Sequence, residues 1–134
     1  AMTGGTPLTF REWGEGDDAR TIPARPDRWG DAVIIRKDTP ASYHLAVVVD
    51  DASQGITDVT RGMDLFAATD IHRLLQVLLG LPEPQYRHHH LLFKTDGQKL
   101  SKSARDTSLK SLRESGITAA EIRARLGFSS SETA

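Results

Sequence analysis

The sequence contains no cysteine among its 134 residues. This absence excludes disulfide bonds and every cysteine-based zinc or redox motif, and it fits a reducing location. Long hydrophobic runs are also missing: LAVVV and LLQVLLGL are far shorter than the roughly 20 residues that cross a bilayer. We therefore expect a soluble, cytoplasmic protein with no membrane partner.

Net charge is nearly absent as well. Seventeen lysines and arginines oppose eighteen acidic residues, for a formal net charge of -1. No global positive field favours a nucleic acid or an anionic membrane, so any anion site must be local. The length is sufficient for one domain with a single hydrophobic core.

The first half of the chain predicts an irregular segment followed by strands. Residues 1–30 are rich in Gly, Pro, Asp and Arg, which indicates loops. The β-branched run at 32–35 predicts a strand. The continuous apolar middle of SYHLAVVVDD (42–51) predicts a strand buried on both faces, next to a further strand at 55–62.

The second half predicts a helix, a strand and a hairpin. Apolar residues in 64–82 follow the i, i+3, i+4 spacing of an amphipathic helix, with Gly80 as its C-cap. Residues 85–93 then predict a strand, and 94–100 a tight hairpin around an Asp-Gly pair.

Two short helices are predicted at the end of the chain, over 107–116 and 118–127. Thr118 and Glu121 form a capping box at the start of the second helix. A disordered tail is expected after them. Strands that alternate with helices indicate an α/β fold.

The segment GQKLSKSARD (97–106) concentrates cations and small residues. Its amides, its hydroxyls and the ammonium groups of Lys99 and Lys102 could converge on a polyphosphate and stabilise charge on a departing phosphate oxygen. The alternative is a solvated surface turn, which composition alone favours because Lys and Ser are common in exposed loops. Spacing does not decide between the two.

KLSKS resembles the KMSKS signature of class I aminoacyl-tRNA synthetases. SYHLAVVVDDASQGITDVTRGMDL (42–65) and LLGLPEPQYRHHHLL (78–92) resemble, in order and spacing, the second half of the catalytic domain of glutamyl-tRNA synthetases. Their shorter paralogues, the glutamyl-Q tRNA(Asp) synthetases, carry the same stretches. The resemblance covers residues 31–112 and is far more specific than a five-residue signature.

The resemblance implies the second half of a Rossmann-like catalytic domain followed by short helices. The catalytic part would span residues 1–106, with an irregular insertion at 1–30, and the helices and tail 107–134. The implied activity is attack of glutamate on the α-phosphate of ATP, which gives glutamyl-adenylate and pyrophosphate, and then transfer of the glutamyl group to RNA. The implied substrates and partners are L-glutamate, ATP with Mg²⁺, and tRNA(Asp) that carries queuosine.

Four residues match functional positions of the family. Lys102 would bind the ATP phosphates and stabilise the leaving pyrophosphate, with assistance from Lys99, so both are candidate catalytic residues. Tyr43 and Arg61 would hold glutamate, because a phenol can hydrogen-bond the amino acid and a guanidinium fork suits a carboxylate. Without the resemblance, Tyr43 would be an ordinary strand aromatic and Arg61 a turn cation.

Two polar groups invite a metal hypothesis. Asp50 and Asp51 end the strand predicted over 42–51, where α/β folds bind ligands, but turn initiation is the favoured explanation and no role is assigned. In a strand, His88 and His90 face one side and His89 the other, so only two could share an ion. A contact near the nucleotide is favoured over zinc. Many family members hold zinc through cysteines, which this chain lacks, so no metal ligand is predicted.

The family's HIGH motif and its upstream glutamate-binding residues are missing. We therefore expect that this chain alone does not activate glutamate and needs the N-terminal half of the catalytic domain as a partner. The 31 residues after Ser103 favour the glutamyl-Q paralogue, because a tRNA-charging enzyme would continue into an anticodon-binding region. The alternatives are a fragment of a glutamyl-tRNA synthetase and a non-catalytic nucleotide- or RNA-binding module.

Overall fold

The computed structural model describes residues 7–14, 18–38, 40–94, 96–100 and 108–128. The chain forms two compact units, residues 1–91 and 92–134. None of the helices in the described ranges is long and apolar enough to cross a membrane.

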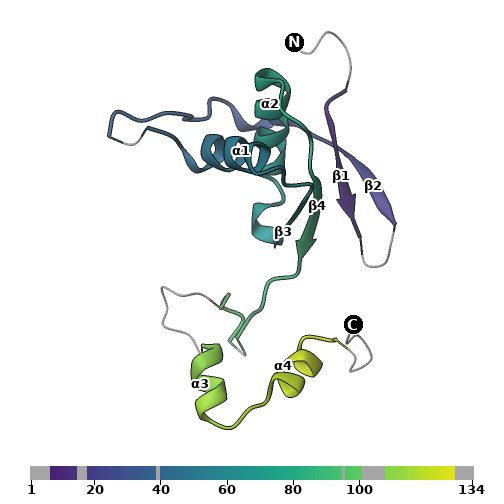
Figure 1. Cartoon of the computed structure of the whole chain (residues 1–134), viewed down its shortest axis with the longest axis vertical. Coiled ribbons are helices and arrows are strands. Elements are labelled where there is room, and N and C mark those ends of the chain that lie inside the picture. Colours follow the sequence, from purple (N-terminus) through teal and green to yellow (C-terminus); the bar gives the residue numbers. More distant parts are fainter. Residues whose placement is uncertain (1–6, 15–17, 39, 95, 101–107, 129–134) are drawn as a thin grey trace. The chain divides into compact units, whose positions relative to one another are not determined.

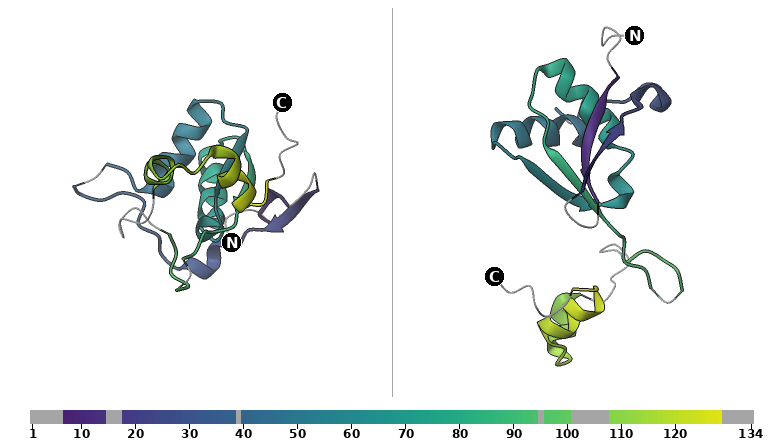
Figure 2. Two further views of the ribbon diagram at one scale, coloured as in Figure 1. Left: turned by 90° about the horizontal axis from the view of Figure 1, so that it is seen from below. Right: turned by 90° about the vertical axis from the view of Figure 1, so that its right-hand side faces the viewer.

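The first unit is built on a four-stranded sheet with the spatial order β2-β1-β4-β3 (Figure 1). Its strands are β1 (Thr9–Trp13), β2 (Ala19–Pro23), β3 (Asp58–Gly62) and β4 (Gln85–His89). Strands β1, β4 and β3 run parallel, and β2 pairs antiparallel with β1 (Figure 2). The carboxyl ends of the three parallel strands therefore lie at the same edge of the sheet.

Two helices complete the first unit, α1 (Tyr43–Ser53) and α2 (Thr69–Leu79). Helix α2 connects β3 to β4, which makes a βαβ unit. Gly80 terminates α2 with a left-handed φ of 66°, as predicted for the C-cap. Two short 3-10 turns, η1 (Pro26–Trp29) and η2 (Met63–Leu65), precede α1 and α2 respectively.

The hydrophobic core has two parts. Phe10 and Tyr86 meet between β1 and β4 with ring centroids 5.8 Å apart, and Val48 of α1 packs with Ile71 and Leu75 of α2. Alternate side chains of β1 and β4 point into this interior. The polar residue two positions after each buried aromatic is therefore buried too, and this positions the site described below.

The prediction of a strand over 42–51 is wrong, because residue 42 caps helix α1 and residues 43–51 form most of it. Ser42 is the N-cap, and its hydroxyl accepts a hydrogen bond from the backbone N–H of Leu45. Valine disfavours a helix by only about half a kcal/mol. Burial of Val48 against α2 outweighs that preference.

Two further expectations about the first half are wrong. Residues 32–35 form no strand: Val33 and Ile35 are exposed, and the Ile34 carbonyl accepts only a loop hydrogen bond from the Ser42 N–H. Residues 1–30 are not irregular throughout, because they contain β1, β2 and η1. Pairing of β1 with β4 stabilises strands whose own apolar pattern is weak.

The later elements agree better with the sequence. Strand β3 lies within 55–62, β4 begins at Gln85 as expected, and α2 lies within 64–82. The buried face of α2 agrees only in part with the predicted apolar face. Ile71 and Leu75 are buried as expected, but Thr69, Asp70 and His72 are buried as well, and Leu78 and Leu79 near the end of the helix are exposed.

The second unit contains the predicted hairpin and both short helices. Phe93 and Lys99 pair in antiparallel fashion, and Gly97 has the expected positive φ of 79°. Helices α3 (Leu109–Glu114) and α4 (Ala119–Arg125) follow, and the capping box at the start of α4 is confirmed. The tail beyond residue 128, predicted to be disordered, lies outside the described residues.

Candidate functional site

Arg61 is the centre of a polar cluster near the carboxyl ends of the parallel strands. It is the penultimate residue of β3, and its pairing partner in β4 is His88, also penultimate. The other two members, Thr69 and His72, come from the first turn of α2. Because α2 starts shortly after β3 ends, the βαβ connection alone brings these four residues together.

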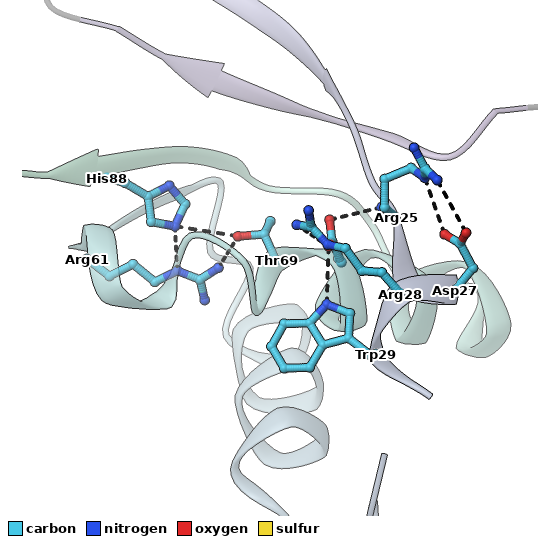
Figure 3. A network of polar contacts seen from close by, with 8 residues as sticks. Arg25, Asp27, Arg28, Trp29, Arg61, Thr69 and His88 are labelled. Carbon is cyan, nitrogen blue, oxygen red and sulfur yellow. Dashed lines mark hydrogen bonds and ion pairs between the residues drawn. The ribbon is translucent and has the colours of Figure 1, made fainter. Parts of the chain in front are cut away.

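Three side chains hold the Arg61 guanidinium. Nε donates to His88 Nε2 at 2.9 Å, and Nη2 donates to Thr69 Oγ1 at 2.6 Å (Figure 3). Nη1 donates to His72 Nδ1 at 2.9 Å. The guanidinium carbon also lies 5.0 Å from the centre of the Tyr86 ring, in a cation–π contact. Contacts along its edges and against one face fix the plane of the guanidinium.

The contact with Arg61 determines the tautomer of His88. Arginine has no acceptor atom, so His88 Nε2 accepts and the proton lies on Nδ1. That N–H donates to Glu12 Oε2 at 2.8 Å, while Glu12 Oε1 accepts the backbone N–H of His88 at 2.8 Å. Burial lowers the pKa of His88, although the Glu12 carboxylate acts in the opposite direction. A buried acid on β1 thus orients the imidazole that orients Arg61.

The contact with Arg61 also determines the tautomer of His72. Its Nδ1 accepts from Arg61, so its proton lies on Nε2, which donates to His44 Nδ1 at 3.0 Å. Burial and the positive charge of Arg61 lower the pKa of His72 from 6.5 to about 3, so the ring is neutral near pH 7. The hydrogen bonds therefore run in one direction, from Arg61 through His72 to His44.

Tyr43 lies at the outer end of this chain of contacts. It is the first residue of α1 and is 51% exposed. Its ring centroid lies 5.8 Å from that of His72 and 5.6 Å from that of His44. A surface pocket of about 500 Å³ opens beside Tyr43 and His44 and is also lined by Trp29 and Arg36. The structure thus places both predicted glutamate-binding residues, Tyr43 and Arg61, against one imidazole.

Sequence reasoning missed the residues that organise this cluster. Thr69 and His72 have the i, i+3 spacing of neighbours on one helix face, and they follow a strand whose penultimate residue is Arg61. That spacing was the available signal. Glu12 gave none, because nothing local distinguishes it from a surface acid.

Asp50 and Asp51 lie in the last turns of α1 and not at the end of a strand. Asp50 is exposed. Partial burial raises the pKa of Asp51, and the charge of Arg61 counteracts this shift. Neither acid therefore lies at the carboxyl end of a strand, which was the position that suggested ligand binding.

The three consecutive histidines lie in different environments. His88 is buried in β4, His89 is exposed at its last position, and His90 lies beyond the strand and is exposed. The expectation that His88 and His90 share one face of a strand is wrong, because β4 ends at His89. Within the described ranges, no three His, Asp or Glu side chains form a group suited to a metal ion.

The two signature lysines belong to the second unit. Lys99 is exposed, and its backbone pairs with Phe93 across the hairpin. Lys102 lies outside the described residues, together with Ser101 and Ser103. The roles of both lysines stay predictions.

A second polar cluster surrounds Asp70, the neighbour of Thr69 on α2. Asp70 is 2% exposed and accepts hydrogen bonds from the backbone N–H of Arg25 at 3.0 Å, Arg28 Nε at 2.8 Å and Trp29 Nε1 at 3.2 Å (Figure 3). Arg28 Nη2 also lies 2.7 Å from Asp70 Oδ2. This cluster anchors η1 to α2.

The parallel strands, the βαβ crossover and the polar cluster near the strand ends define a Rossmann-like α/β catalytic domain. Residues 18–133 match the family described as tRNA synthetases class I (E and Q), catalytic domain. The chain belongs to this family, and the family prediction is confirmed.

Several curated relatives are named glutamyl-Q tRNA(Asp) synthetase. The protein from Rhodobacter capsulatus is 50% identical over 99 residues, which are 74% of this chain and 36% of that protein. The protein from Xanthomonas oryzae is 57% identical over 74 residues, which are 55% of this chain and 25% of that protein. The chain thus spans about a third or less of the length of these relatives.

Solved structures agree on the fold. A glutamate tRNA ligase from Elizabethkingia meningosepticum, in complex with its amino acid, is 30% identical with a TM-score of 0.54. The match covers 66% of this chain and 17% of that protein. A glutamate-tRNA synthetase from Elizabethkingia anophelis has a TM-score of 0.53 at the same identity and covers 66% of this chain and 18% of that protein.

Proposed function

We propose that the complete protein activates glutamate with ATP and transfers the glutamyl group to the queuosine base of tRNA(Asp). The family match and the curated relatives named for this activity support the proposal. The observation that carries it for this chain is the contact of Arg61 and Tyr43 with the same buried His72.

The first step forms a mixed anhydride. A carboxylate oxygen of glutamate attacks the α-phosphate of ATP, the bond between that phosphorus and the bridging oxygen of pyrophosphate breaks, and pyrophosphate leaves. In the second step a nucleophile of the RNA attacks the glutamyl carbonyl, and AMP leaves. Neither step requires a covalent enzyme intermediate, so the protein contributes binding, orientation and charge stabilisation.

Arg61 and Tyr43 would bind glutamate. A guanidinium has five N–H groups, and the three contacts with His88, His72 and Thr69 leave two that would donate to a carboxylate. The half-exposed hydroxyl of Tyr43 would hydrogen-bond the amino acid. Because the Arg61 plane is fixed before glutamate arrives, little conformational entropy is lost on binding.

Lys99 and Lys102 would act on the phosphates. Lys102 would bind ATP and neutralise charge that develops on the departing pyrophosphate, with assistance from Lys99. One such contact contributes about 10²- to 10³-fold in rate. We propose that the N-terminal half of the catalytic domain supplies the rest of the ATP and glutamate sites, and that the protein acts in the cytoplasm, with tRNA.

Glutamate-dependent ATP–pyrophosphate exchange tests the proposal. The polypeptide of the complete reading frame should show exchange with glutamate but not with glutamine, and this chain alone should show none. Lys102→Ala should reduce exchange at least about 100-fold. Lys110→Ala is the matched control, because Lys110 is an exposed lysine of α3 that pairs with Glu114. Exchange retained in Lys102→Ala would refute the assigned role.

The tRNA-charging reaction is the second candidate, favoured because the structural neighbours are a glutamate tRNA ligase and a glutamate-tRNA synthetase. Their identity to this chain is 30%, against 50% or more for the glutamyl-Q relatives, so we rank it lower. Transfer assays with tRNA(Asp) with and without queuosine, and with tRNA(Glu), distinguish the two. Exchange activity absent in every form would favour a non-catalytic nucleotide- or RNA-binding module.

A further inference from the structure

We propose that His72 is a positioning residue, which holds the Arg61 guanidinium and the Tyr43 side chain in the relative arrangement that binds glutamate. This role rests on the proposed function, since it concerns the same site. His72 itself need not touch the substrate.

His72 is buried and has two directed polar contacts, which fix the orientation of its ring. It is 1% exposed, and its two ring nitrogens contact different partners, Arg61 Nη1 and His44 Nδ1. A ring flip would exchange Nδ1 with Cδ2 and Nε2 with Cε1. Two C–H groups would then face Arg61 and His44, and both hydrogen bonds would be lost. The arrangement therefore admits one ring orientation and one tautomer.

His72 supplies an acceptor that Arg61 needs. With His88 and Thr69 holding Nε and Nη2, His72 is the contact on the remaining nitrogen, Nη1. A leucine of similar volume would fill the space but would leave that nitrogen without its acceptor and free the guanidinium to tilt. The need here is for an acceptor atom, which packing alone does not satisfy.

His72 also connects Arg61 to α1. His44 and Tyr43 occupy the first turn of α1, and His72 contacts both, through a hydrogen bond and an edge-to-face ring contact respectively. These contacts fix the start of α1 against the end of β3. The distance between the Tyr43 hydroxyl and the Arg61 guanidinium therefore depends on His72.

Two substitutions separate positioning from simple packing. His72→Leu keeps the volume and removes both polar contacts, whereas in His72→Gln the amide oxygen can accept from Arg61 and the amide nitrogen can donate to His44. In the complete protein we expect His72→Leu to raise the KM for glutamate about 10- to 100-fold, with kcat and the KM for ATP changed by less than about threefold. His72→Gln should restore most of the glutamate affinity.

The control is His89→Gln, because His89 is exposed and its Nδ1 contacts the neighbouring His90 carbonyl. It should leave all three kinetic constants unchanged. An unchanged glutamate KM in His72→Leu would overturn the positioning role. Equal losses for glutamate and ATP would overturn it as well, because they indicate general destabilisation.

Nitrogen-15 NMR of the unsubstituted protein provides a readout that does not require activity. We expect His72 to show a bare Nδ1 and a protonated Nε2 at pH 7, and the opposite tautomer would overturn the proposal. Glutamate activity together with the wrong tautomer or an unchanged KM would reject the positioning role alone. The expected tautomer in a protein without glutamate activity would reject the proposed function and, with it, the assignment of His72 to glutamate.

Discussion

The first unit contains two polar clusters that share α2 and differ in what they leave accessible. Thr69 and Asp70 are consecutive, yet Thr69 contacts Arg61, whereas Asp70 contacts η1 (Figure 3). In the Asp70 cluster a buried acceptor is surrounded by donors from one short segment. In the Arg61 cluster buried acceptors surround a half-buried cation, and the contacts continue outward to an exposed tyrosine.

This difference indicates two roles for buried polar groups, one in stability and one in ligand binding. The Asp70 cluster is closed, so its energy stabilises the attachment of η1. The Arg61 cluster extends to the exposed Tyr43. Its contacts with His88, His72 and Thr69 use three of the five guanidinium N–H groups, and we propose that the other two donate to glutamate. Substitutions in the first should change stability, and substitutions in the second should change glutamate binding.

The largest effect is expected for Asp70→Ala. It removes three hydrogen bonds to a buried carboxylate and an ion pair. The partner Arg28 is half-exposed and can be hydrated, so we expect a loss of about 3 kcal/mol, the lower end for a broken buried pair. Thermal unfolding should show a Tm lower by more than about 10 °C.

Asp27→Asn is the control for Asp70→Ala, because Asp27 pairs with Arg25 at the surface. It should leave the Tm unchanged. Below the melting temperature Asp70→Ala should also keep the glutamate KM. A large rise in that KM would show that the two clusters act as one.

Arg61→Lys should have the opposite profile. A lysine offers one nitrogen, which cannot reach His88, His72 and Thr69 together or retain a planar fork for a carboxylate. We expect the glutamate KM of the complete protein to rise about 100-fold, while the Tm falls less than in Asp70→Ala. Arg87→Lys, at an exposed position of β4, is the matched control. A stability loss without a change in KM would contradict the distinction between the clusters.

The sequence predicted the fold best where local signals and tertiary contacts agree. Gly80 ends α2, Gly97 forms the hairpin, and Thr118 with Glu121 starts α4. Each of these depends on the backbone conformation or side-chain hydrogen bonds of a few adjacent residues. The valines of α1 are different, because their preference for strands was reversed by packing of Val48 on an element that lies more than 20 residues further along.

The candidate site could be predicted only in part for a related reason. Tyr43 and Arg61 followed from the resemblance, whereas their connection through His72 depends on how α1, α2 and β3 meet. Glu12 is charged at a position of β1 that faces the interior, and this conceals the alternation that would have revealed the strand. Its burial is explained by His88, which lies 76 residues away in the sequence.

Acid should lower the free energy of unfolding through His72 of the Arg61 cluster. The folded-state pKa of His72 is lowered from 6.5 to about 3, so between these values the unfolded chain binds a proton that the folded chain does not. The stabilisation is complete above pH 6.5 and decreases as the pH falls, by about 1.4 kcal/mol per pH unit for this one group. Denaturant unfolding between pH 6.5 and 5 should show this dependence in Asp70→Ala and lose that part in His72→Gln. An identical slope in His72→Gln would contradict the assignment.

Trp29→Phe should have the smallest effect, because it removes one donor from Asp70 and keeps the aromatic ring. The bond is 3.2 Å long and Trp29 is partly exposed, so the expected loss is about 0.5 kcal/mol, or a few degrees in Tm. If the hydrogen bond is the cause, the loss should vanish when Trp29→Phe is made in the Asp70→Ala background. Trp13→Phe is the control: its indole donates to Gln85, outside both clusters, so its effect should be the same in either background. A Trp29→Phe loss that persists without Asp70 would mean that ring packing, and not the buried acid, holds this end of η1.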